Sequence, residues 1–241
     1  MRLYKAHYIL RYRSPIVVDM SYTICIARYD EVVSWALPFA TNVVVCNKGG
    51  KLASPLPQRR TPNFGREEYA YLKYIVDDYE CLSDVSIFVQ AGLKHHLDIY
   101  GDLRFSKEAP LVKHMLFQCK MFGHSMNAAP HRLGFCSAHP KFKLANRYPH
   151  MIDSKTTFGE WFESNVRAPF PTDPKWFKNG IFGVRREHIL SRSKEYYQGL
   201  MKNFTSSDEY ELCHYLERSW VYVFNVDRPL PEKSTGEQGA V

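Results

Sequence analysis

The chain has 241 residues, of which 45% are hydrophobic and 15% aromatic, and its formal net charge is +7. This length suffices for one large domain or two small ones with a substantial core. No window approaches the roughly 18 apolar residues of a transmembrane helix, and residues 1–21 lack the apolar stretch of a signal peptide. Composition therefore excludes a membrane-spanning chain, and we expect a cytoplasmic protein.

The excess of positive charge indicates affinity for an anionic partner. A nucleic acid, a nucleotide diphosphate and an acidic membrane surface all meet that description. The basic residues are spread along the chain without the long runs of a nucleic-acid-binding tail, so no nucleic acid is expected as a partner. The six cysteines are scattered without a CxxC pair, which indicates small buried side chains rather than a disulfide framework or a zinc site.

The first hundred residues alternate between short apolar runs and helical patterns. Runs rich in β-branched residues predict three buried strands at Tyr22–Ala27, Asn42–Cys46 and Val85–Val89. Helical patterns separate these strands and cover Val32–Phe39 and about 61–79. Strands that alternate with helices form a parallel sheet with crossover helices, so the sequence predicts an α/β fold with a mainly parallel central sheet.

Polar side chains stand at the end of each predicted strand. In chain order they are Arg28, Asp30, Glu31, Asn47, Lys48 and Gln90. The carboxyl ends of parallel strands meet at one edge of an open sheet, where such sheets bind their ligands. We therefore expect a ligand site at this edge, the alternative being a set of solvated loops.

The start of the helix at about 61–79 has the features of an anion site. Gly65 lets a ligand approach backbone N–H groups, and Arg66 can form paired hydrogen bonds with a phosphate. Thr61 or Asn63 is expected to cap the helix. The alternative is an ordinary capped helix start.

The second half of the chain is less regular. A strand is expected at Asn179–Val184, one helix at Glu187–Asn203, another at about 208–224, and a flexible tail at 229–241. Glu217 borders the apolar stripe of the last helix, so its carboxylate must be paired, metal-bound or turned toward a polar cavity. An arginine partner is the structural alternative for this carboxylate.

Several short motifs, taken in their order, resemble the nucleotide-sugar half of the glycosyltransferase A-fold. The match looks closest to a family of uncharacterised proteins, known only as a domain of unknown function and thought to be glycosyltransferase-like. The resemblance spans about residues 22–225. Its motifs are Arg28-Tyr29-Asp30-Glu31, Cys46-Asn47-Lys48-Gly49, Asn63-Phe64-Gly65-Arg66-Glu67, Phe88-Val89-Gln90-Ala91-Gly92, Phe182-Gly183-Val184-Arg185-Arg186 and Leu216-Glu217-Arg218-Ser219-Trp220.

The resemblance implies a single Rossmann-like domain of the glycosyltransferase A type over residues 1–228. Its nucleotide-sugar half would cover about 22–100 and its acceptor half about 101–228. The implied activity is transfer of a sugar from a nucleotide-sugar donor to a glycan or protein acceptor. The residues implied to bind the donor are Arg28, Asp30, Glu31, Asn47, Lys48, Asn63, Gly65, Arg66 and Gln90. Among them, Asp30 would bind the base or ribose and Arg66 the diphosphate.

Catalysis by an inverting enzyme of this kind needs a carboxylate that removes the proton of the acceptor hydroxyl. Glu217 is the leading candidate, and Glu211 and Asp208 are the others on the same predicted helix. Trp161 and Trp176 lie near proline-rich turns, where they either stack on an acceptor sugar or belong to the core.

One departure from the A-fold concerns its metal. The fold usually places an Asp-x-Asp, which holds manganese or magnesium against the diphosphate, where this chain has Gln90-Ala91-Gly92. Either His95, His96 or Asp98 supplies a metal ligand, or arginine and lysine neutralise the diphosphate without a divalent cation.

Three rival functions remain open. A catalytically inactive module would keep the fold and bind a nucleotide or glycan without turnover, and the missing Asp-x-Asp favours it. The net charge of +7 motivates a nucleic-acid-binding protein, whose affinity would fall steeply with salt. The many histidines suggest a metal hydrolase, although they do not occur at metal-ligand spacing.

Overall fold

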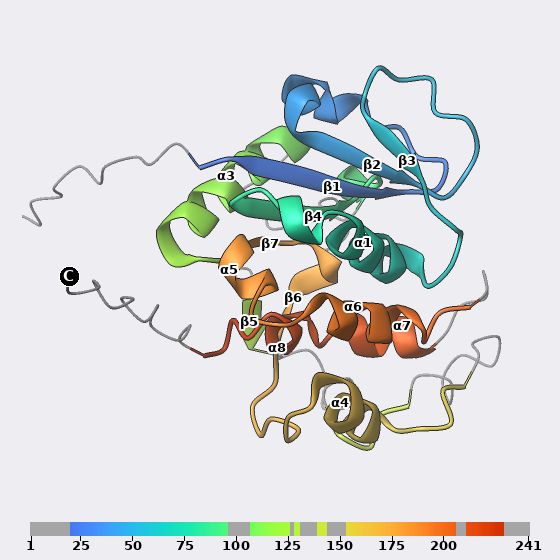
Figure 1. Cartoon of the computed structure of the whole chain (residues 1–241), viewed down its shortest axis with the longest axis vertical. Coiled ribbons are helices and arrows are strands. Elements are labelled where there is room, and N and C mark those ends of the chain that lie inside the picture. Colours follow the sequence, from blue (N-terminus) through green and yellow to red (C-terminus); the bar gives the residue numbers. More distant parts are fainter. Residues whose placement is uncertain are drawn as a thin grey trace, which may run out of the picture.

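The computed structural model describes residues 20–95, 107–125, 128–130, 139–143, 153–205 and 211–228. Within them, a five-stranded sheet runs through the molecule (Figure 1). Its strands, in spatial order β3-β2-β1-β4-β7, are Gln58–Arg60, Val43–Asn47, Tyr22–Arg28, Val85–Gln90 and Phe182–Arg185. The first four are parallel to their neighbours, and β7 is antiparallel to β4. The predicted α/β fold with a mainly parallel central sheet is confirmed.

One face of the sheet packs against η1 (Ser34–Asn42) and α3 (Glu108–Phe122), and its core is aliphatic. Side chains of a strand alternate between the two faces, so every second residue points here. The strand residues in this core are Ile24, Ile26, Val43, Val45, Val85, Ile87 and Val89. Apolar residues on both faces explain why these strands read in the sequence as continuous apolar runs.

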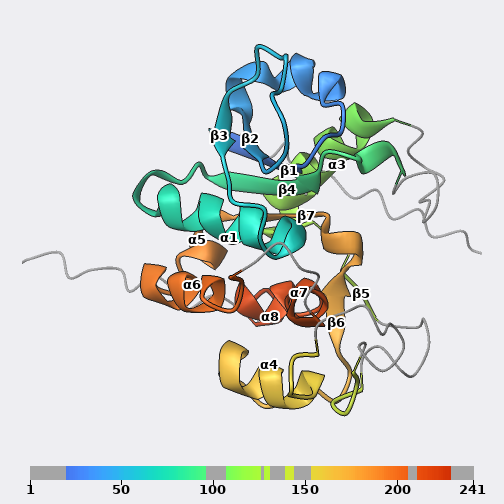
Figure 2. The same ribbon diagram turned by 90° about the vertical axis from the view of Figure 1, so that its right-hand side faces the viewer.

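The other face is covered by several layers of helices and is rich in aromatic residues. Helix α1 (Arg66–Asp77) lies on the sheet, and α6 (Lys194–Met201), α7 (Glu211–Glu217) and α8 (Trp220–Val223) lie beyond it (Figure 2). The outermost helix is α4 (Phe158–Val166).

A chain of ring contacts joins these helices to the sheet. Ring centroids of Phe88 and Phe182 are 4.9 Å apart, those of Phe182 and Trp220 5.5 Å, and those of Trp220 and Phe224 5.2 Å. The C-terminal helices therefore share one core with the sheet rather than forming a core of their own.

Two connections of opposite direction define the ligand edge of the sheet. From β1 the chain passes through η1 to β2 and then β3, and it returns through α1 to β4 on the other side of β1. The connecting helices cover opposite faces of the sheet, as right-handed crossovers require. The carboxyl ends of β1 and β4 consequently flank the point where the strand order reverses, which is where open α/β sheets bind ligands.

Four details of the predicted elements were wrong. Helix η1 extends to Asn42 as a 3-10 helix, with a kink at Phe39, directly after Pro38, where the backbone angles are not helical. The region predicted as one helix over Glu187–Asn203 contains two, α5 (Arg186–Ile189) and α6, because the Ser193 hydroxyl caps α6 by accepting the Tyr196 N–H.

The remaining two concern α7 with α8 and the strand β7. The predicted last helix is interrupted between Glu217 and Trp220, where Ser219 donates its hydroxyl to the Tyr215 carbonyl. Strand β7 begins only at Phe182, because Asn179 and Gly180 adopt left-handed backbone angles with φ of 59° and 62°.

Short elements without a strong pattern escaped prediction. Strand β3 consists of Gln-Arg-Arg, and β5 (Ala128–Pro130) and β6 (Lys175–Phe177) form a separate antiparallel pair. Among the residues that the structure describes, no helix has both the length and the apolar character needed to cross a membrane.

Candidate functional site

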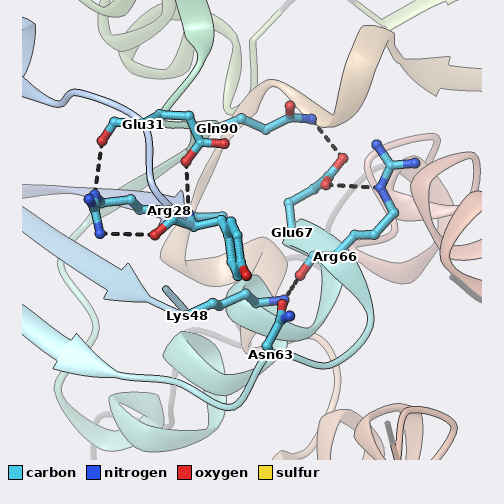
Figure 3. A pocket seen from close by; sticks show the side chains of 9 residues that line it. Arg28, Glu31, Lys48, Asn63, Arg66, Glu67 and Gln90 are labelled. Atoms are coloured by element: carbon cyan, nitrogen blue, oxygen red, sulfur yellow. Dashed lines mark hydrogen bonds and ion pairs between the residues drawn. The ribbon is translucent and has the colours of Figure 1, made fainter. Parts of the chain in front are cut away.

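A pocket of about 260 Å³ opens at the point where the strand order reverses (Figure 3). We call it the switch-point pocket. It lies between the carboxyl ends of β1 and β4 and the start of α1. Its lining consists of Ala27, Arg28, Tyr29, Glu31, Lys48, Asn63, Arg66, Glu67 and Gln90.

Six of the nine residues implied to bind a donor therefore line one pocket. They are Arg28, Glu31, Lys48, Asn63, Arg66 and Gln90. The other three, Asp30, Asn47 and Gly65, are not part of its lining. Glu67 lines the pocket but was assigned no role in the site from the sequence.

Arg28 is a buried cation that organises the end of β1. It is 6% exposed, and its guanidinium donates to the carbonyls of Glu31 and Tyr29, both at 2.9 Å. It also donates to the Asn47 side-chain oxygen at 2.8 Å and to the Gly50 carbonyl at 3.3 Å. These four acceptors take up most of the donor capacity of the guanidinium.

Asn47 and Asp30 hold the turn after β2 instead of facing the pocket. The Asn47 amide donates to the Gly50 carbonyl at 3.0 Å, and the Asp30 carboxylate accepts the Gly50 N–H at 3.1 Å. A Cβ at Gly49 would lie 1.7 Å from the Tyr29 carbonyl oxygen, so only glycine fits there. This turn fixes the position of Lys48.

Lys48 reaches from this turn to the start of α1. Its ammonium donates to the backbone carbonyls of Phe64 and Arg66. Burial lowers the pKa of Lys48 to about 8, and the nearby Glu68 and Glu67 carboxyls oppose that decrease. An ammonium has three N–H donors, so one is left over from these two carbonyls.

The start of α1 has an unusual backbone. Gly65 and Arg66 both have positive φ, of 48° and 49°. Gly65 is the residue before the first helical turn, and no side chain caps the helix, so the predicted Thr61 or Asn63 cap was wrong. A Cβ at Gly65 would lie 2.6 Å from the Phe204 ring, which explains the glycine.

Arg66 is the most exposed cation of the pocket. Its side chain is 42% exposed, and its Nε lies 3.6 Å from the Glu67 carboxylate. The first N–H groups of α1 lie at the same place, and a helix N-terminus carries a partial positive charge.

Glu67 ties the start of α1 to β4. Its carboxylate accepts a hydrogen bond of 2.6 Å from the Gln90 side chain, which also donates to the Asn179 carbonyl at 3.2 Å. Figure 3 shows Arg66, Glu67 and Gln90 turned toward one another. Glu31, at the end of β1, is exposed and accepts the Tyr29 N–H at 2.8 Å.

Glu68 is a buried carboxyl that the sequence interpretation missed. It is 1% exposed, and its Oε2 has no hydrogen-bond partner among the described residues. Burial raises its pKa well above the usual range, and the charges of Glu67 and Glu217 add to that effect. Its position three, four and seven residues before Tyr71, Leu72 and Ile75 placed it on the buried stripe of α1.

Glu217 and Glu211, two of the carboxylates predicted as catalytic bases, do not line the switch-point pocket. Glu217 lies 3.4 Å from both the His214 ring and the Arg218 guanidinium, so the predicted arginine partner is present. Burial by itself raises the pKa of Glu217, but the His214 hydrogen bond and the Arg218 and Arg66 charges outweigh burial and bring it to about 2. Glu211 is fully buried and accepts from the Ser154 hydroxyl at 2.9 Å.

The two tryptophans predicted for acceptor binding occupy different settings. Trp161 is 4% exposed and packs against Tyr215 with ring centroids 6.0 Å apart. Trp176 is half-buried in β6, and the Arg218 guanidinium lies 5.4 Å from its ring centroid. Neither lines the pocket.

The structure describes one of the three metal ligands considered from the sequence. His95 is exposed after the end of β4, while His96, Asp98 and the candidate base Asp208 lie outside the described residues. Within the described part of the chain, no three histidine, cysteine, aspartate or glutamate side chains gather as a metal site would require.

Comparison with known proteins identifies a family without assigning a function. No curated protein and no solved structure matches the chain significantly. Residues 29–235 match the family described as "Protein of unknown function (DUF3431)". The match covers most of the chain and contains every residue of the switch-point pocket except Ala27 and Arg28. The chain belongs to this DUF3431 family.

Proposed function

We propose that the protein is a glycosyltransferase that binds the diphosphate of a nucleotide-sugar donor in the switch-point pocket. The observation that carries this proposal is the placement of Arg66, Lys48 and the N-terminus of α1 around one pocket at the reversal of strand order. Each of these groups favours an anion, and the pocket lies where α/β sheets bind nucleotides. The resemblance to the glycosyltransferase A-fold supplies the sugar part of the proposal.

In this proposal the diphosphate lies against α1. Arg66 has a partly exposed guanidinium that can form two parallel hydrogen bonds with phosphate oxygens. The remaining N–H of Lys48 and the first N–H groups of α1 approach the same oxygens. Arg28 acts mainly by positioning the loops, because its Nε and Nη1 groups donate to the chain itself.

A divalent cation does not fit the donor set of this pocket. The Glu67 carboxylate already accepts from Gln90 and faces Arg66, and the Glu31 carboxylate accepts the Tyr29 N–H. Glu31 is then the one carboxylate of the lining that a cation could use, and a single carboxylate beside two cations forms a poor cage for manganese or magnesium. We therefore assign charge neutralisation to Arg66 and Lys48.

The proton acceptor is assigned by position and charge. A general base works best when its pKa lies near the operating pH, and a pKa of about 2 makes Glu217 a weak base. Glu31 is exposed at the end of β1 and lines the pocket. We therefore transfer the role of base from Glu217 to Glu31.

The nucleotide part is tested by thermal unfolding of the purified chain with UDP, GDP, CMP and their sugars, with and without manganese. A ligand at about 100 times its Kd stabilises a protein by about 2.7 kcal/mol, so a binding nucleotide raises Tm measurably. Lys48→Met is expected to reduce this rise. Lys73→Met on the same helix, which removes an exposed pair with Asp77, leaves it unchanged. No rise with any nucleotide would contradict the proposal.

The catalytic part is tested by donor hydrolysis or transfer with the nucleotide sugar found in that screen. Glu31→Gln is expected to abolish turnover while nucleotide binding persists, and Glu217→Gln is expected to retain turnover. The opposite result would return the role of base to Glu217.

A second candidate function is a nucleotide-binding module without turnover. Two observations favour this module. The Glu67 carboxylate accepts a hydrogen bond from Gln90, and the partners of Glu217 lower its pKa, so neither carboxylate is available as a base. Nucleotide binding without hydrolysis or transfer on any tested donor would support this function.

A further inference from the structure

Helix α3 exposes a cluster of large apolar side chains. Phe117 is 58% exposed, Met121 42% and Phe122 54%, whereas Val112 and Cys119 on the other side of the helix are fully buried against the sheet. Three of the seven exposed large hydrophobic residues of the described chain therefore lie within six positions. Single exposed apolar residues are ordinary on a protein surface, but a cluster marks an interaction site.

Lysines accompany this cluster along the helix. Lys113, Phe117 and Met121 are spaced four residues apart and share one stripe, and Lys120 stands beside it. Glu108, at the opposite end, is the only acidic residue of α3. We call Lys113, Phe117, Lys120, Met121 and Phe122 the α3 patch.

A second cavity, of about 340 Å³, adjoins the end of the α3 patch. Met121 and Phe122 form part of its wall, and Arg185 and Arg228 lie in the same lining. Arg185 donates to the carbonyls of Cys119 and Lys120, at 3.0 and 2.6 Å, and so connects the cavity to the last turn of α3. The cavity thus joins the apolar wall of the patch to two guanidinium groups.

The charge of this region favours an anionic partner. Its cations are Lys113, Lys120, Arg185 and Arg228, and the acidic groups beside them are Glu187, 3.4 Å from Arg185, and Asp227, 3.6 Å from Arg228. The cations are in excess, in line with the net charge of +7 for the whole chain. Exposed aromatic side chains surrounded by lysines are typical of surfaces that bind the interface of anionic membranes.

We propose that the α3 patch docks the protein on an anionic phospholipid bilayer. Phe117, Met121 and Phe122 enter the region between headgroups and acyl chains, and Lys113 and Lys120 contact lipid phosphates. The second cavity receives one headgroup phosphate beside Arg228, whose side chain is 60% exposed, while Arg185 holds the cavity wall to the last turn of α3.

This orientation leaves the switch-point pocket open to solvent. Arg185 pairs with Val85 at the beginning of β4, whereas the pocket lies beyond Gln90 at its end. The patch and the pocket consequently lie at opposite ends of the sheet, and α3 lies on the face opposite α1 (Figure 1). The inference is independent of the function proposed for the pocket.

Co-sedimentation of the full chain with vesicles tests this inference. The vesicles are pure phosphatidylcholine, or phosphatidylcholine with about 30% phosphatidylserine, each at low and high salt. We expect binding to the phosphatidylserine vesicles that weakens with salt. Each lysine near the surface contributes about 1 kcal/mol, so Lys113→Gln and Lys120→Gln should each lower the partition coefficient about fivefold.

The apolar part is tested with Phe117→Ser/Phe122→Ser, which should lower the partition coefficient at least tenfold. Leu37→Ser is the matched control, because Leu37 is 44% exposed on η1, outside the patch, and should bind as the wild type does. Absence of binding to phosphatidylserine vesicles, or equal binding by the patch variants, would overturn the inference. Sedimentation equilibrium without lipid measures the oligomeric state of the wild type. A dimer that the Phe117→Ser/Phe122→Ser variant converts to a monomer would also overturn the inference.

Discussion

The two walls of the switch-point pocket use cations in opposite ways. On the wall formed by β1 and β2, Arg28 and Lys48 are 6% and 8% exposed and donate to backbone carbonyls. On the wall formed by α1, the Arg66 side chain is 42% exposed and has a carboxylate at 3.6 Å. The buried cations hold loops together, with one N–H of Lys48 left for a ligand, whereas Arg66 presents a partly exposed guanidinium to solvent. Residues of one type in one pocket can therefore have different tasks, and burial distinguishes them.

Arg28→Met should produce the largest effect, because it removes the donor that four acceptors share. Its loss leaves the carbonyls of Tyr29, Glu31 and Gly50 and the Asn47 oxygen without this partner. A buried polar group left unpaired costs about 1–3 kcal/mol, and the Gly50 carbonyl and the Asn47 oxygen each keep a second donor, so the total decrease in unfolding free energy should be about 3 kcal/mol. Urea denaturation measures it.

The control for this substitution is Arg59→Met. Arg59 is 41% exposed and pairs with Asp78 at 2.7 Å, so its loss should cost no more than about 1 kcal/mol. Similar decreases for both variants would mean that Arg28 does not hold the wall, and the contrast between the two walls would fail.

Glu217→Gln should have an intermediate effect that depends on pH. The partners of Glu217 lower its pKa in the folded protein to about 2, from an unfolded value of about 4.3. A depressed carboxyl pKa gives stability that is fully present above the unfolded pKa and is lost as the pH falls toward the folded one. The wild type should therefore exceed the variant by about 2 kcal/mol at pH 7, allowing for partial exposure, and the gap should close between about pH 4.3 and 2.

Denaturation series at several pH values measure this gap. Glu187→Gln is the control, since the Glu187 side chain is 41% exposed, compared with 25% for Glu217. A gap for Glu217→Gln that does not change below pH 4 would mean that the carboxylate is not held by His214 and Arg218. It would then be available as a base after all.

The parallel part of the sheet could be predicted because its signal is local. The strands β1, β2 and β4 are continuous apolar runs. Each predicted end of these strands lies within one residue of the observed end. The convergence of polar residues at their carboxyl ends follows from the geometry of parallel strands alone. Six pocket residues were accordingly found without a structure.

The remaining features depend on contacts between distant segments. The turn at Gly49 supplies an acceptor for Arg28, so this turn decides whether the guanidinium binds a ligand or carbonyls of the chain. The turn follows β2 and is not part of the sequence of β1. The pKa of Glu217 depends on His214 and Arg218, and on Arg66 from α1. Trp161 is buried in the core because α4, which begins at the Thr157 capping box, packs against α7 through the contact between Trp161 and Tyr215. Apart from the pairing of Glu217 with its neighbours His214 and Arg218, these outcomes are not visible in local spacing.

Arg66→Ala should have the smallest effect on stability and the clearest effect on binding. Its pair with Glu67 is long and partly exposed, so the unfolding free energy should change by no more than about 0.5 kcal/mol. The affinity for the nucleotide found in the thermal screen should fall about tenfold or more, since a charged hydrogen bond contributes about 1.5–3 kcal/mol.

Titration calorimetry measures the affinity, and Arg59→Ala is the matched control because the Arg59 side chain is 41% exposed on β3, outside the pocket lining. Arg66→Lys keeps the charge but loses the paired geometry, so it should recover only part of the affinity. If Arg66→Ala instead destabilised the fold as strongly as Arg28→Met while affinity held, Arg66 would belong with the buried cations, and the ligand-facing wall would have to be sought elsewhere.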